Sequence, residues 1–153
     1  MSGLVLSLKA EEKFLVNGAL VQNGSKRSQI RLPDTTVNVL RLSDCLHPDD
    51  IDTPIKRAYY VAQLILAGDL TQAEGATRLM ALLVSLEKVF AGTALSGAIL
   101  KSVRHASNAR YYSVLVGLRR LFSVEMEMLK PNMPSVEPVR RSMTGMQQNA
   151  QGR

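Results

Sequence analysis

Residues 14–24 read FLVNGALVQNG and contain two Asn-Gly pairs, Asn17-Gly18 and Asn23-Gly24. Asn and Gly both tolerate positive φ, which the type I′ turn of a β-hairpin requires at its two central positions. Further short apolar stretches lie at 4–8, 30–32 and 37–42. The pattern predicts an antiparallel β-meander of about five short strands in residues 1–43, with a very short middle strand. A sheet of this size needs to pack against another element.

Beyond residue 43 the apolar residues recur at helical spacing. Thr53-Pro54 suits the N-cap and first position of a helix that Gly68 would end. Thr71 and Glu74 have the spacing of a capping box and open a second helix. A third helix is expected over 95–106 and a fourth from about Ser107, which could reach Leu129. Residues 44–130 are therefore predicted to form an all-α bundle of about four helices, packed with the strands as one α+β unit.

The remaining segment, 131–153, contains three prolines and few large apolar residues. Such a composition buries too little surface to offset the entropy of ordering the chain. We expect a flexible, disordered tail.

Composition places the chain among globular proteins, with 153 residues, 46% hydrophobic and 21% charged. Cys45 is the sole cysteine, so no intrachain disulfide can form and a reducing compartment is expected. The N-terminus lacks the features of a signal peptide, and no apolar run approaches the roughly 20 residues of a membrane span. These features predict a cytoplasmic protein without membrane association.

Catalytic and metal-binding patterns are not found in the sequence. The two histidines, His47 and His105, have no cysteine or carboxylate at metal-ligand spacing. The aspartates between Asp44 and Asp52 lack the calcium-loop pattern, and no phosphate-binding glycine motif occurs. We therefore expect no enzyme, no metal and no cofactor.

The charge balance permits an anionic partner without proving one. There are 19 Lys and Arg against 13 Asp and Glu, a net charge of +6. Residues 101–120 hold five of the cations and no acid. A basic face of this kind suits nucleic acid, although an ordinary solvated helix face has the same composition. Aromatic residues are few, which argues against a binder that stacks many bases.

Several short motifs together resemble the FlbT family over about residues 3–130. They are GLVLSLK at 3–9, EKFLVNGA at 12–19, NVLR at 38–41, TP at 53–54, KR at 56–57, YY at 59–60, AQL at 62–64 and YYSVLVGLR at 111–119. The resemblance implies a post-transcriptional regulator of flagellin synthesis. Such a regulator binds the 5′ untranslated leader of flagellin mRNA and represses translation or promotes mRNA degradation, although some members act positively.

The resemblance also implies FlaF and flagellin as partners, and it leaves a homo-oligomer open. An alternative is therefore a protein-interaction module that acts through flagellin or FlaF and affects the mRNA indirectly. Binding of RNA through phosphates would weaken steeply with salt, whereas a helix-in-groove contact would not.

The five predicted strands are also similar to CsrA, a small β protein that binds mRNA leaders. By this analogy Leu4 and Arg41, in the first and last strands, would contact RNA. Tyr60 falls on the polar side of the first helix beside Lys56 and Arg57, so it could stack on a base, anchor a protein partner or lie beneath the sheet. The candidate RNA-binding residues are Leu4, Lys9, Lys13, Lys26, Arg27, Arg31, Arg41, Lys56, Arg57, Tyr60, Arg110, Arg119 and Arg120.

Overall fold

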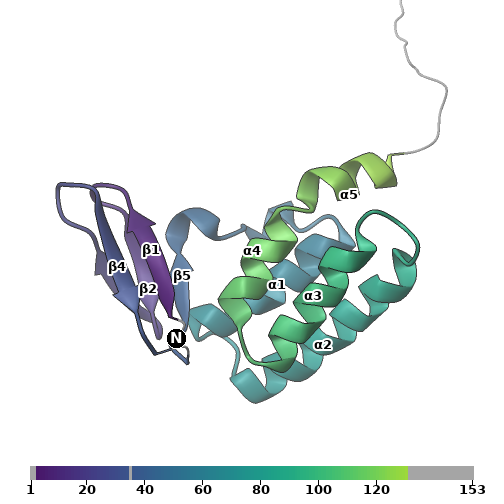
Figure 1. Cartoon of the computed structure of the whole chain (residues 1–153), viewed down its shortest axis with the longest axis horizontal. Helices are drawn as coiled ribbons and strands as arrows, with labels where there is room; N and C mark the ends of the chain where they lie inside the picture. The colour runs from purple at the N-terminus through teal and green to yellow at the C-terminus, as the bar shows by residue number, and fades with distance from the viewer. Residues whose placement is uncertain (1–2, 35, 131–153) are drawn as a thin grey trace, which may run out of the picture.

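The computed structural model describes residues 3–34 and 36–130, and it confirms an α+β fold in which short antiparallel strands precede a group of helices (Figure 1). The tail predicted for 131–153 lies outside the described residues. No described helix combines the length and the apolar character needed to cross a membrane.

Five strands form two small sheets. One sheet pairs β1 (Leu4–Leu8) with β4 (Ser28–Leu32), and the other has the order β3-β2-β5. Its strands are β2 (Lys13–Val16), β3 (Ala19–Gln22) and β5 (Val39–Arg41). All pairs are antiparallel, but only β2 and β3 are neighbours in both sequence and sheet. The strand number is therefore confirmed, whereas the pairing differs from that of a simple meander.

The two Asn-Gly pairs behave differently. Asn17 and Gly18 have φ values of 50° and 83° and close the β2–β3 hairpin as predicted. Asn23-Gly24 does not form a second tight hairpin, because β3 and β4 belong to different sheets. The Asn23 side chain instead donates to the carbonyls of Lys9 and Lys26, at 2.7 and 2.9 Å. The hydrogen bond to the Lys9 carbonyl directs the chain toward β1. This direction cannot be predicted from the turn residues alone.

The strands share a small core of their own. Leu6 and Leu8 of β1 are buried, and the intervening Ser7 is exposed, which is the alternation of a half-buried strand. They pack with Phe14 of β2 and Val39 of β5, so this core joins the two sheets.

The helical part contains five α-helices among the described residues. Two single-turn 3₁₀ segments, Leu42–Asp44 and Pro48–Asp50, lead into it. The helices are α1 (Pro54–Ala67), α2 (Gln72–Val89), α3 (Ser96–Ser107), α4 (Tyr111–Arg119) and α5 (Phe122–Leu129). The predicted caps are confirmed, since the Thr53 hydroxyl accepts from the Lys56 amide and Gly68 ends α1 with φ of 83°.

The fourth predicted helix is divided in two, so the helix count is higher than expected. The break at Arg120 and Leu121 separates α4 from α5. After it, Glu125 reaches the start of α1, where its Oε2 accepts from the Ile55 amide at 2.8 Å. Glu125 is fully buried. A buried carboxylate that caps another helix gives a reason for the change of direction.

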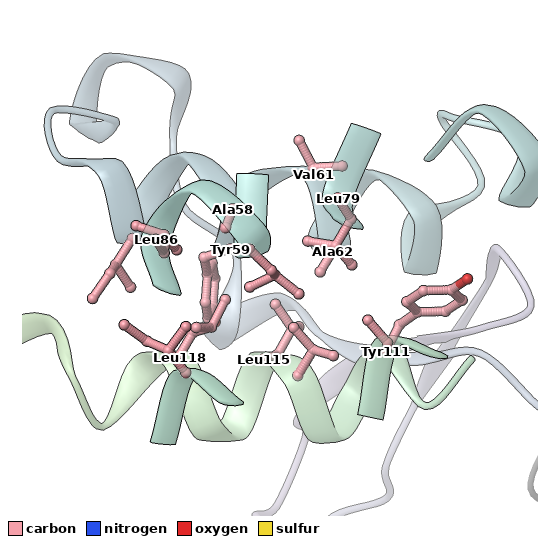
Figure 2. Packing of buried hydrophobic residues seen from close by; sticks show 14 of the residues in the cluster. Ala58, Tyr59, Val61, Ala62, Leu79, Leu86, Tyr111, Leu115 and Leu118 are labelled. Carbon is pink, nitrogen blue, oxygen red and sulfur yellow. The ribbon is translucent and has the colours of Figure 1, made fainter. Parts of the chain in front are cut away.

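Helix α1 lies at the centre of the main core. Its residues Ala58, Tyr59 and Ala62 are fully buried between α2 and α4 (Figure 2). Leu79 of α2 and Leu115 of α4 pack in the same cluster. Tyr112 of α4 packs against both this cluster and the strand core, which connects the two parts of the fold.

Candidate nucleic-acid interface

Arg41 at the end of β5 makes an ion pair within the strands and a hydrogen bond to the helices. Arg41 Nη1 on β5 lies 2.9 Å from Glu12 Oε2, and Arg41 Nε donates to the Tyr112 hydroxyl of α4 at 3.4 Å. The side chains of Arg41 and Glu12 are only 20% and 10% exposed. Arg41 therefore lies in the joint between strands and helices and does not project freely from the sheet. Its contact with RNA stays a prediction.

A second arginine holds the segment after β5 against the helices. Arg119 of α4 makes a 2.9 Å ion pair with the Asp44 carboxylate and donates to the Tyr59 hydroxyl at 2.8 Å. The Tyr59 hydroxyl in turn donates to the Asp44 carbonyl at 2.6 Å. Burial raises the pKa of Tyr59, and the hydrogen bond from Arg119 opposes this shift. Arg119 thus has partners within the protein, although its side chain remains 45% exposed.

Glu12 predicts a dependence of stability on pH. Desolvation raises the pKa of Glu12, but hydrogen bonds from the Lys9 amide and from Arg41 outweigh it, so the pKa lies below its ordinary value. A carboxyl with a lowered pKa in the folded state stabilises the protein above its unfolded pKa, and this contribution is lost as the pH falls through the folded value.

We therefore expect the melting temperature to fall as the pH drops below the ordinary Glu pKa of 4.5, and to fall less in Glu12→Gln than in the wild type. The matched control is Glu11→Gln, since Glu11 is exposed and makes no ion pair within the described residues. Parallel pH curves for the wild type and Glu12→Gln would contradict the prediction.

The cations of the strands are exposed and divide into two groups. Lys9 and Arg27 line one shallow depression at the tip of the β1–β4 sheet, and Lys26 is held nearby by Asn23. Arg31 and Lys13 lie on the outer faces of β4 and β2, since their neighbours Ile30 and Phe14 pack inward. None of these five cations makes an ion pair within the described residues. They share the surface of the strands without forming one cluster.

The candidates on α1 have different environments. Lys56 pairs with Asp52 at 3.2 Å and lies over the Phe122 ring, 5.7 Å from its centroid. Arg57 is exposed, and Tyr60 is half-buried and belongs to neither hydrophobic cluster.

Leu4, the candidate of the first strand, is half-buried at the start of β1. It lines a groove between α3 and α4.

A group of cations without acidic partners among the described residues lies on α3 and at the two ends of α4. We call it the α3–α4 surface, and it consists of Lys101, Arg104, Arg110 and Arg120, with His105 among them. Burial lowers the pKa of His105, and the charges of Arg110, Lys101 and Arg104 lower it further, so these side chains lie close together. No acidic residue occurs between Glu87 and Glu125. Within the described residues no member of this surface makes an ion pair, which leaves its positive potential available to an anionic ligand.

The α3–α4 groove is part of this surface. It has an open volume of about 640 Å³, and Lys101, His105 and Arg120 lie along it. The acid-free stretch 101–120 indicates Lys101, Arg104, Arg110 and Arg120 as one basic face, although only Arg110 and Arg120 are among the candidate RNA-binding residues. His105 has no such signal in the sequence, and the packing of α3 on α4 brings it among these cations.

Comparison with known proteins agrees with the resemblance seen in the sequence. A family model described as "Flagellar protein FlbT" matches residues 4–129. The chain belongs to the FlbT family. A "Flagellum biosynthesis repressor protein FlbT" of Caulobacter vibrioides is 31% identical over 130 residues, which cover 82% of this chain and 89% of the relative.

Other FlbT relatives are of similar length. A probable flagellum biosynthesis repressor of Chelativorans is 32% identical over 81% of this chain and 84% of its own. One of Brucella abortus is 27% identical over 90% of this chain and 88% of its own. No solved structure matches the chain. The likeness of its strands to CsrA stays a prediction.

Proposed function

We propose that this protein represses flagellin synthesis after transcription, by binding the 5′ untranslated leader of flagellin mRNA and blocking its translation or promoting its degradation. Family membership supports a regulatory role in flagellum biosynthesis, since the relatives are named flagellum biosynthesis repressors. The observation that carries the RNA-binding step is the α3–α4 surface, whose cations lack acidic partners among the described residues. Phosphate oxygens are natural ligands for such cations.

The strand cations are a second set of possible phosphate contacts, separate from this surface. Leu4 of β1 lines the α3–α4 groove, and its neighbour Val5 pairs across the sheet with Arg31 of β4. Beyond Arg31, the sheet leads to Lys9 and Arg27 at its tip. Because Val5 and Arg31 face away from the groove that Leu4 lines, an RNA strand has to pass around the edge of the sheet to reach both sets of cations.

A salt titration tests this function. Wild-type affinity for a leader RNA should fall linearly with salt on logarithmic axes. Lys101→Ala/Arg104→Ala should bind more weakly, with a slope shallower by about 1.4, because each phosphate neutralised on a single strand contributes about 0.7 to the slope. The matched control is Arg78→Ala/Lys88→Ala on α2, whose cations are exposed away from the groove. We expect the control to retain the wild-type slope. Absence of leader binding by the wild type at low salt would refute the proposal.

An alternative function is supported by α5. Val124, Met126, Met128 and Leu129 are each between 39% and 46% exposed on this short helix. Exposed methionine and aliphatic side chains are typical of surfaces that bind helical partners. The protein would then act through flagellin or FlaF, with indirect effects on mRNA. Salt-insensitive regulation that depends on α5 and not on the α3–α4 surface would favour this alternative.

A further inference from the structure

We propose that the α3–α4 groove binds a single unstacked nucleotide of the RNA, with the base in the groove and its phosphates at the cations beside it. This inference rests on the proposed function and assigns a distinct role to one part of the α3–α4 surface. The other cations of the surface bind the backbone without regard to sequence, whereas a groove that holds a base makes the interaction depend on RNA structure.

The floor of the groove is apolar and formed by small side chains. Gly97 and Ala98 line it from α3, and Val116 and Gly117 line it from α4. A Cβ placed on Gly117 would lie 3.3 Å from the Ser102 hydroxyl, so Gly117 allows α3 and α4 to pack closely at the bottom of the groove. A Cβ placed on the exposed Gly97 meets no atom within 4 Å, so a larger side chain fits at this edge of the groove. A flat base with apolar faces fits such a floor.

Polar groups in the groove match the rest of a nucleotide. Ser113 lines the groove and is partly exposed, so its hydroxyl can hydrogen-bond a base edge, whereas Ser102 is only 1% exposed and lies in the contact between the helices. Tyr112 supplies an aromatic ring in the same lining. Lys101 of α3 and Arg120, directly after α4, both line the groove and can hold the phosphates on either side of the base.

The dimensions of the α3–α4 groove favour a compact ligand over an acidic helix of a partner protein. Helix α4 has nine residues and is therefore about 14 Å long. Leu4 of β1 and Leu121 after α4 also line the groove, so elements outside the two helices restrict it. A helix docked through two turns spans about 11 Å, nearly the length of α4, so the restriction by Leu4 and Leu121 is what favours a shorter ligand. A volume of about 640 Å³ is within the range of small-ligand sites.

The test fills the groove without changing its charge. Gly97→Leu places a side chain into open space and replaces a poor helix former, so we expect a melting temperature at least equal to that of the wild type. Affinity for the leader RNA should fall about tenfold, because the stacking of one base is removed, while the salt slope stays unchanged. The matched control is Ala81→Leu, which adds the same side chain at an exposed position of α2 and should bind like the wild type.

A second measurement uses the wild-type protein, so its main result does not depend on how a variant folds. Abasic substitutions are placed along the leader one at a time and tested against the wild type. We expect one position to reproduce the tenfold weakening, and to cause no further weakening with Gly97→Leu, because both changes remove the same interaction.

The outcomes separate the two proposals. If the wild type binds the leader and Gly97→Leu binds it equally well, the nucleotide site is refuted and the proposed function stands. If the wild type does not bind the leader at low salt, the function fails and the site fails with it. Normal RNA binding by Gly97→Leu together with defective repression in cells would assign the groove to a protein partner and overturn the inference.

Discussion

Tyr59→Ala is expected to lower the free energy of unfolding by about 3–5 kcal/mol, the range for removing a large aromatic side chain from a core. Tyr59 is fully buried at the centre of α1 and packs edge-on against Phe122, with 5.1 Å between ring centroids. Its hydroxyl also joins Arg119 to the Asp44 carbonyl, so the substitution removes both packing and two hydrogen bonds. Urea denaturation of the purified protein measures the destabilisation.

The adjacent residue provides the control. Tyr60 has the same side chain on the same helix, but it is half-buried and belongs to neither hydrophobic cluster. Tyr60→Ala should therefore cost at most about 1 kcal/mol. Tyr60 thus does not lie in the core beneath the sheet, and a role in contacting RNA or a partner protein stays a prediction. Similar destabilisation by the two substitutions would contradict this assignment of the core.

Arg41→Ala should destabilise the protein by about 2–3 kcal/mol, because it leaves the mostly buried Glu12 carboxylate without its charged partner. Sequence reasoning alone expects this substitution to weaken RNA binding and leave the fold intact. Because Arg41 is in an ion pair, the substitution lowers the stability of the fold whether or not it also weakens RNA binding. Thermal or urea unfolding measures it, and RNA binding must be compared at a temperature where both proteins remain folded.

Arg31→Ala is the control for that substitution. Arg31 is an exposed strand arginine without an ion pair among the described residues, so its removal should change stability by no more than about 0.5 kcal/mol. The double variant Glu12→Gln/Arg41→Ala should be more stable than Arg41→Ala alone, since no unpaired carboxylate remains. Equal stability of Arg31→Ala and Arg41→Ala would show that the fold does not depend on the ion pair.

The helix caps and the first hairpin turn could be predicted from the sequence, because local chemistry decides them. Thr53, Gly68 and Asn17-Gly18 act where they were expected to act, because a cap or a hairpin turn depends on a few adjacent residues. The FlbT resemblance was confirmed over nearly all of the described chain. The Asn23-Gly24 pair and the length of the fourth helix were misjudged, because bonds from Asn23 to Lys9 and from Glu125 to α1 cross long stretches of sequence.

The sequence by itself determined the α+β class, the antiparallel strands, the helix caps, the excess of positive charge and the family. Only the tertiary structure decided which cations remain available. Arg41 and Arg119 look like Arg31 and Arg120 in the sequence, yet within the described residues the first two have carboxylate partners and the last two do not. Distant residues such as Glu12 and Asp44 supply those partners, and a linear pattern carries no information about which residues meet in three dimensions.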